Sequence, residues 1–345
     1  MRFFILMPLI FSASFIFAQP TQPADYGLQA FSITDKTLGT IRFYVSSKGI
    51  REVKPVLLAL DGSGHFPLAT LVLLKKNAFV FNSFDNDILQ LADKFHVILI
   101  SKPGVNFCDT VHIDKDSAGV AEALNLLTPS AEYRRRAGLN WRVQAASRVI
   151  DYVYTHLPVD KLKVIAYGYS EGGQVVPKLA LLNKKITHCA PIVGSGLNQF
   201  YDFIAAVRLK ATQGTITQQE AQYQVDSLFA RFAAIYAAPH NTNQDWEGHS
   251  YQRWASYCSD IPIDNLIKLN IPIFMAAGST DRNSPVYSQE YVRLEFLRLG
   301  KKNLSFHVYP TDHFFNEVKM VNGKEEIISH KKEMIQDMMK WLGIH

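Results

Sequence analysis

The sequence has few cysteines, few charges and no long apolar run beyond its first residues. Three Cys residues among 345 are too few for a disulfide scaffold, and an odd number leaves at least one without an intrachain partner. Charged residues make up 19% and hydrophobic residues 48%, which excludes a disordered chain. The formal net charge of +5 is dispersed, apart from a short basic run at 134–136. That run is typical of a solvated surface, so we expect no nucleic-acid partner.

The first 18 residues have the pattern of an export signal. Arg2 precedes an uncharged apolar run at 3–17, and Ala18 supplies a small residue where cleavage would occur. The run is shorter than the ~20 residues of a membrane span, although an uncleaved anchor is the alternative. We therefore expect a secreted or periplasmic protein with no stable membrane insertion after cleavage. Residues 19–27 are expected to form a disordered arm that precedes one domain at 28–345.

The rest of the chain alternates short apolar runs with segments of helical spacing. Such alternation is typical of an α/β protein whose parallel sheet is covered by helices on both faces. Two alternating runs at 28–35 and 38–46 precede this pattern and predict an antiparallel hairpin. The sequence therefore predicts a mostly parallel, eight-stranded sheet. The six later strands are expected at 54–60, 95–101, 162–167, 186–193, 271–277 and 304–309, and a final helix at 324–342.

The alternation is interrupted once, at residues 195–262. This segment has helical spacing and contains no strand-like run between two expected strands of the sheet. An insertion at the carboxyl edge of such a sheet commonly covers the ligand crevice. We therefore predict a helical lid over the site.

A nucleophile motif follows the expected strand at 162–167. Gly168-Tyr169-Ser170-Glu171-Gly172 opens a helix there, which is the strand–turn–helix context of a Gly-x-Ser-x-Gly elbow. The serine of such an elbow lies on a strained turn above the sheet, and the two flanking glycines let strand and helix approach closely. Ser170 is therefore the predicted nucleophile. A glycine-rich turn without chemistry is the alternative.

An acid and a base are expected after Ser170, each in a loop that follows a strand. Asp281 follows the apolar run at 271–277, and His313 follows the run at 304–309. A serine hydroxyl becomes a good nucleophile when a histidine takes its proton and a carboxylate orients that histidine. We therefore predict Asp281 as the acid and His313 as the base. The other late histidines lie within a strand, on the final helix or at the terminus: His307, His330 and His345.

Two backbone N–H groups are expected to bind the oxyanion. The first belongs to Glu171, which starts the helix after the nucleophile. The second should come from the loop after the strand at 54–60, where Asp61-Gly62-Ser63-Gly64 supplies a flexible backbone. We choose the Ser63 N–H as this second donor.

These features together resemble the α/β-hydrolase superfamily. The resemblance covers roughly residues 28–343 and is carried by Ser170, Asp281, His313, the loop at 62–64 and the insertion at 195–262. The Ser-Glu-Gly-Gly elbow and the Gly-Ser-Gly loop are similar to those of bacterial esterases and of prolyl-oligopeptidase-like catalytic domains. One departure is Asp61, which stands where the family often has histidine.

Other residues carry weaker signals. Tyr169 and the insertion residues Trp246, Tyr251 and Trp254 are candidates for substrate binding, with packing of the insertion as the alternative. A disulfide between Cys108 and Cys258 is also left open. The sequence has no metal-ligand motif and no three-glycine dinucleotide fingerprint, so we expect neither a metal nor a cofactor.

The sequence thus predicts a secreted serine hydrolase that cleaves a carboxylic ester through an acyl-enzyme. A small-molecule or oligomeric ester is the expected substrate. A peptidase or amidase, and an acyltransferase, are alternatives on the same triad. A non-catalytic binding protein is less favoured, because the ordered triad is complete. The acyl and alcohol parts of the substrate and the oligomeric state stay open.

Overall fold

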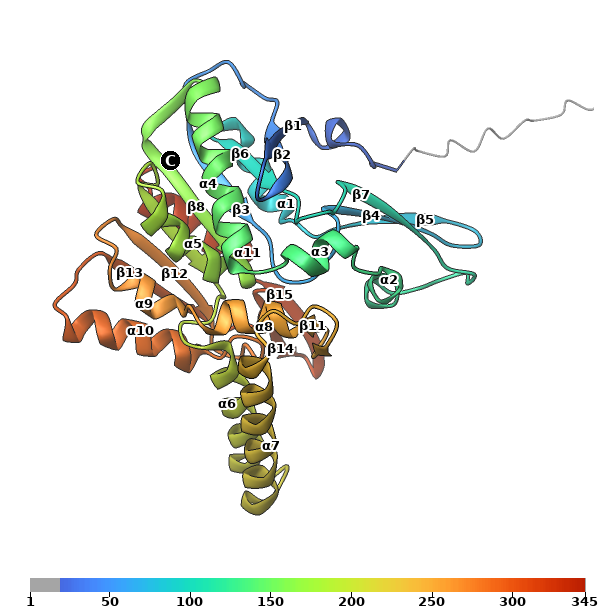
Figure 1. Ribbon diagram of the computed structural model, residues 1–345, viewed down its shortest axis with the longest axis vertical. Coiled ribbons are helices and arrows are strands. Elements are labelled where there is room, and N and C mark those ends of the chain that lie inside the picture. Colours follow the sequence, from blue (N-terminus) through green and yellow to red (C-terminus); the bar gives the residue numbers. More distant parts are fainter. Residues whose placement is uncertain (1–18, 345) are drawn as a thin grey trace, which may run out of the picture.

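The central sheet carries the site. The computed structural model describes residues 19–344 and contains an eight-stranded sheet of order β1-β2-β6-β3-β8-β9-β12-β13 (Figure 1). Neighbours from β6 to β13 are parallel, whereas β1–β2 and β2–β6 are antiparallel. This confirms the predicted mostly parallel sheet with an N-terminal hairpin. The strands are β1 (Leu28–Asp35), β2 (Gly39–Ser46), β3 (Lys54–Leu60), β6 (His96–Ile100), β8 (Val159–Tyr169), β9 (His188–Ile192), β12 (Ile273–Gly278) and β13 (Leu304–Tyr309).

Helices cover both faces of this sheet, which explains the continuous apolar runs of its inner strands. Every residue of β6 and of β12 is buried. One face packs against α4 (Leu139–His156), α5 (Glu171–Leu182), α9 (Pro262–Leu266) and α10 (Val286–Arg298). The other face packs against α1 (Asn86–Leu89) and α11 (Lys331–Trp341). The short 3-10 helix η2 (Gln90–Asp93) follows α1.

A second, three-stranded sheet was not predicted from the sequence. It has the order β5-β4-β7 and lies beside the central sheet (Figure 1). Its strands are only five residues long, and the short, mostly apolar runs of β4 and β5 were the missed signals. The strands are β4 (Ala69–Leu73), β5 (Ala78–Asn82) and β7 (Cys108–His112), followed by two short helices, α2 (Val120–Leu126) and α3 (Ala131–Arg136).

The expected final helix at 324–342 is wrong at its start. Residues 324–329 form β15 (Lys324–Ser329), which pairs with β14 (Asn316–Val321), and α11 begins only at Lys331. Asn322 and Gly323 join the two strands with φ values of 51° and 77°. An Asn-Gly pair with positive φ is the favoured two-residue hairpin turn, and its presence was the missed signal.

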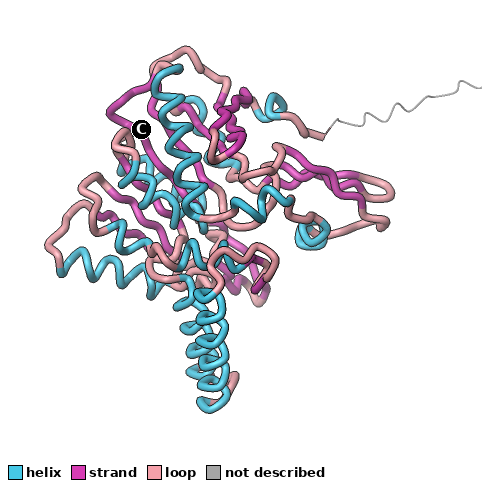
Figure 2. The backbone as a smooth tube through the Cα atoms, in the orientation of Figure 1, coloured by secondary structure: helices cyan, strands magenta, loops and turns pink. Residues whose placement is uncertain are grey.

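The insertion forms two parts. α6 (Gln199–Thr212) and α7 (Gln218–Ala237) pack together and extend away from the central sheet, as Figures 1 and 2 show. The second part contains a two-stranded hairpin, which the sequence did not predict, and one helix near the nucleophile. Its elements are β10 (Asp245–Trp246), β11 (His249–Ser250) and α8 (Tyr251–Cys258).

Two expectations about the ends and the cysteines need correction. Residues 19–27 do not form a disordered arm, because η1 (Pro23–Tyr26) is a 3-10 helix and the Tyr26 hydroxyl donates to Asn82 Oδ1 over 2.8 Å. Cys108 and Cys258 are both free thiols in different parts of the structure, so the disulfide left open is not formed.

The predicted signal at 1–18 lies outside the described residues. Between residues 19 and 344 no helix has the length and apolarity to cross a membrane.

Candidate active site

The turn between β8 and α5 places Ser170 in a strained conformation. Its φ is 54° and its ψ is −116°, an uncommon region for a residue with a side chain. A Cβ at Gly168 would lie 2.1 Å from the Gly172 carbonyl oxygen, and one at Gly172 would lie 2.3 Å from the Leu60 carbonyl oxygen. Both glycines are therefore needed for the close approach of strand, helix and oxyanion loop, as the elbow motif predicts.

Ser170, His313 and Asp281 form one hydrogen-bonded chain. His313 Nε2 lies 2.9 Å from Ser170 Oγ, and His313 Nδ1 lies 2.8 Å from Asp281 Oδ2. A ring with its proton on Nδ1 satisfies both contacts, since it donates to the carboxylate and accepts from the hydroxyl. The other Asp281 oxygen accepts from the backbone N–H groups of Asn283 and Ser284, at 2.8 and 2.9 Å. The carboxylate is thus fixed toward His313 and is fully buried.

Three features decide the fold: the elbow at Ser170, the strand order of the central sheet, and the chain order Ser170, Asp281, His313. The chain has the α/β-hydrolase fold. Solved structures agree: it is similar to Pyrococcus horikoshii acylaminoacyl peptidase with 12% identity and a TM-score of 0.51, over 92% of this chain and 41% of that one. It is similar to Porphyromonas gingivalis dipeptidyl peptidase 4 with 13% identity and a TM-score of 0.50, over 91% and 35%.

A third similar structure, AbyA5, has 12% identity and a TM-score of 0.50, over 92% of this chain and 72% of that one. The chain spans less than half the length of the two peptidases. No family model and no curated protein matches the sequence. Identities this low establish the fold, and the fold by itself does not determine an activity.

The loop after β3 faces Ser170, as expected for an oxyanion donor. Gly62 is its point of contact, because a Cβ there would lie 3.5 Å from Ser170 Cβ and 3.8 Å from Ser170 Oγ. Ser63 is exposed, and its carbonyl oxygen accepts from Lys102 Nζ over 3.5 Å. Glu171 is the first residue of α5, so its N–H has no acceptor within the helix. The site thus has candidate donors on both sides of Ser170.

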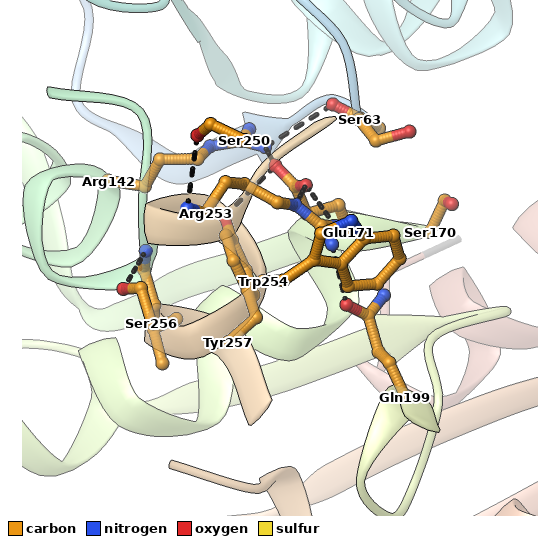
Figure 3. A network of polar contacts seen from close by, with 12 residues as sticks. Ser63, Arg142, Ser170, Glu171, Gln199, Ser250, Arg253, Trp254, Ser256 and Tyr257 are labelled. Atoms are coloured by element: carbon orange, nitrogen blue, oxygen red, sulfur yellow. Dashed lines mark hydrogen bonds and ion pairs between the residues drawn. The ribbon is translucent and has the colours of Figure 1, made fainter. Parts of the chain in front are cut away.

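A buried network of charged side chains lies beneath these donors and was missed in the sequence (Figure 3). Asp61 pairs with Lys102 and with Arg142, both at 2.6 Å. Glu171 pairs with Arg142 at 3.0 Å and with Arg253 at 2.5 Å. These five side chains are only 4% to 7% exposed. The side chain of Glu171, predicted only as the bearer of a backbone donor, is therefore the centre of this network.

The network keeps the Glu171 carboxylate ionised. Burial opposes the charge on Glu171, but Arg253 and Arg142 outweigh it and hold the pKa of Glu171 well below its usual range. Burial also lowers the pKa of the neighbouring His249 to about 3, so that ring is neutral near pH 7. By formal charge, the network has three cationic side chains and two carboxylates, an excess of one positive charge close to Ser170. The cationic side chains are Lys102, Arg142 and Arg253, and the carboxylates are Asp61 and Glu171.

Two signals could have revealed the network. Arg142 lies three residues after Leu139 and four before Ala146, on the buried face of its helix, where an arginine needs a partner. Lys102 comes directly after the fully buried strand β6 and the buried Ser101, so its charge is also expected to need a partner. Neither signal names the partner, because Asp61, Glu171 and Arg253 are far away in the sequence.

A cavity of about 240 Å³ opens beside the nucleophile. Gly62 and Tyr169 form its side toward Ser170, and the three-stranded sheet contributes Phe81. Its lining is mostly apolar; the charged residues in it are Asp61 and an ion pair of 3.2 Å between Asp85 and Lys331. The remaining large apolar residues that line it are Leu60, Leu68, Phe84, Leu99, Ile100 and Phe314. The size and lining fit one apolar side chain or ring of a ligand.

Tyr169, one of the candidates for substrate binding, lines this cavity, and its hydroxyl also donates to the His313 carbonyl oxygen. The other aromatic candidates have a packing role instead. Trp246, Tyr251 and Trp254 belong to the aromatic core of the insertion, where Tyr251 and Trp254 are 1% and 5% exposed. Trp254 Nε1 donates to the Trp246 carbonyl oxygen over 2.7 Å. A substrate-binding role for these three residues is therefore not supported by their positions.

Residues 19–344 contain no group of three or more His, Cys, Asp or Glu side chains arranged to hold a metal ion.

Proposed function

We propose that this α/β-hydrolase is a serine hydrolase that cleaves an acyl bond through Ser170. The observation that carries the proposal is the chain of hydrogen bonds from Ser170 Oγ to His313 at 2.9 Å and from His313 to Asp281 at 2.8 Å. The nucleophile, the base and the orienting carboxylate are within hydrogen-bond reach of one another before any substrate is present.

Each step follows from this arrangement. Ser170 Oγ adds to the substrate carbonyl carbon while its proton moves to His313 Nε2, and Asp281 stabilises the resulting imidazolium. Backbone N–H groups of Glu171 and of the loop at 62–63 bind the oxyanion. His313 then protonates the leaving group, which departs and leaves an acyl-enzyme. Water, deprotonated by His313, releases the acid and restores Ser170.

We propose a peptide or amide bond as the substrate bond. The similar structures named as acylaminoacyl peptidase and dipeptidyl peptidase 4 favour this alternative over the ester expected from the sequence. A carboxylic ester is the second candidate, supported by the mostly apolar cavity beside Ser170, which suits the acyl group of a small ester. In either case the apolar part of the acyl group would occupy this cavity.

The two candidates differ in their leaving groups, which provides a test. Wild-type protein and Ser170→Ala are compared on p-nitroanilides of apolar amino acids, free or N-acetylated, and on p-nitrophenyl esters with the same acyl groups. A peptidase cleaves both series, because it can protonate an amine leaving group. Cleavage of esters alone would assign the ester alternative. Equal activity of Ser170→Ala on both series would refute a serine hydrolase.

Export is also proposed rather than established. Arg2, the apolar run at 3–17 and Ala18 support it. Mature protein recovered outside the cytoplasm should begin at Gln19, and a mature N-terminus at Met1 would contradict cleavage.

A further inference from the structure

Arg142 contacts both segments that flank the nucleophile. Its Nη2 donates to the Asp61 carbonyl oxygen at 2.9 Å and to Asp61 Oδ1 at 2.6 Å. Its Nη1 donates to the Gly62 carbonyl oxygen at 3.3 Å and to Glu171 Oε1 at 3.0 Å. The guanidinium thus joins the oxyanion loop to the first residue of α5, from a position on α4 with a side chain that is 7% exposed.

These bonds fix the direction of the loop N–H groups. In a trans peptide the C=O and the following N–H point in opposite directions, and the described chain has no cis peptide. Because the carbonyls of Asp61 and Gly62 point to Arg142, the N–H groups of Gly62 and Ser63 point away from it. Lys102 holds the Ser63 carbonyl in the same manner. The orientation of the predicted oxyanion donors therefore depends on buried cations.

The Glu171 donor is held by the same network through its side chain. Glu171 Oε1 accepts from Arg142 and from the Tyr257 hydroxyl, the latter at 2.9 Å, and Glu171 Oε2 accepts from Arg253. Arg253 also donates to Gln199 Oε1 at 2.9 Å. Figure 3 shows Arg142 and Arg253 gathered about Glu171, with Ser170 close by. The insertion thus supports the nucleophile turn.

We propose that Arg142 is a positioning residue that sets the spacing of the two oxyanion donors, and that Arg253 and Tyr257 of the insertion hold the Glu171 donor in place. The proposal rests on the proposed function. It assigns the insertion a fixed supporting role at the site. A planar guanidinium with several donors can bridge carbonyl and carboxylate oxygens at once, whereas an ammonium acts as a point charge.

The remaining ion pairs of the network should allow an Arg142 variant to fold. Without Arg142, Asp61 keeps Lys102 and Glu171 keeps Arg253, so two carboxylates face two cations. No buried charge is left without a partner. An unpaired buried charge is what makes the loss of one ion-pair partner strongly destabilising. Arg142→Gln and Arg142→Lys are therefore suitable tests. Arg148→Gln is the matched control, since Arg148 lies on the same helix and makes an exposed ion pair with Asp35 at 3.2 Å.

The experiment measures kcat, KM and the affinity for a boronic acid with the acyl group of the best substrate. The boronic acid forms a tetrahedral adduct in which Ser170 Oγ bonds to boron and an oxygen occupies the oxyanion site. Loss of one oxyanion donor typically lowers kcat about 10²–10³-fold. We expect Arg142→Gln to lower kcat and boronate affinity in parallel by about 10- to 100-fold, with KM within about threefold. Arg142→Lys should restore thermal stability but not kcat, and Arg148→Gln should match wild type.

Several results would overturn the proposal. Wild-type kcat and boronate affinity in Arg142→Gln would do so, as would a fall in kcat with unchanged boronate affinity. If Arg142→Gln fails to fold, Tyr257→Phe takes its place, because it removes a single hydroxyl from Glu171; a kcat equal to wild type would then refute the role of the network. An active Ser170→Ala protein would instead refute the proposed function, which keeps the two failures distinct.

Discussion

The buried carboxyl of Asp202 can be tested through the pH dependence of the free energy of unfolding. Its carboxyl lies in the first turn of α6, the residue is 8% exposed, and Oδ1 has no hydrogen-bond partner among residues 19–344. Burial raises the pKa of Asp202 from 3.8 to about 8; nearby Ser195 lowers it, and the negative charge of Asp281 adds to the rise. We therefore expect Asp202 to be protonated in the native protein at neutral pH.

The sign of the effect follows from the proton count. The folded-state pKa lies above the unfolded value, so between pH 4 and pH 8 the native protein retains a proton that the unfolded chain releases. Stability from this group is fully present below pH 4 and falls by about 1.4 kcal/mol per pH unit as pH rises toward 8. The cumulative loss at pH 7 is at most about 4 kcal/mol.

Asp202→Asn removes this dependence, because the amide is neutral at every pH and has nearly the same size. The variant should gain stability over wild type as pH rises from 4.5 to 7.5, measured by urea unfolding at several pH values. Asp226→Asn, at an exposed position of α7, is the control and should show a constant difference. An Asp202→Asn difference that does not change with pH would refute a buried, protonated Asp202.

Three further outcomes are expected. Gly172→Ala should abolish turnover and lower Tm, because its Cβ would lie 2.3 Å from the Leu60 carbonyl oxygen; wild-type kinetics would contradict the close approach. Tyr169→Phe removes the hydroxyl that donates to the His313 carbonyl oxygen and should lower kcat by about 2- to 10-fold, whereas an unchanged kcat would show that this bond does not orient His313. All three cysteines should react with a thiol reagent after unfolding without reductant, and dithiothreitol should leave Tm unchanged; fewer than three reactive thiols would reveal a disulfide.

The parts of the site that were predictable are encoded locally. The Ser170 elbow needs a strand, two small residues and a helix within a few positions, so its signal is contained in one short segment. Asp281 and His313 were found because each follows an apolar run, and parallel strands bring their carboxyl ends to one edge of the sheet. Apolar runs also predicted the six later strands of the central sheet, because burial on both faces leaves such runs, whereas alternation predicted the hairpin of β1 and β2.

The parts that were missed carry a weaker or ambiguous local signal. β4 and β5 have short, mostly apolar runs, but only a turn separates them and they do not fit the alternation of strands and helices, while β7 is mostly polar and exposed. The aromatic residues of the insertion looked equally suited to a pocket and to a core. Which role they have depends on the partners that surround them, and Phe200, Phe203 and Phe232 supply a core.

The sequence by itself determined the α/β architecture, the elbow at Ser170 and the candidates Asp281 and His313, because periodicity, turn chemistry and chain order are properties of neighbouring residues. The tertiary structure alone decided that Arg142, Arg253 and Lys102 share one buried network with Asp61 and Glu171. A charged side chain can be buried only beside a compensating partner. That partner comes from whichever distant segment the fold brings within hydrogen-bond distance.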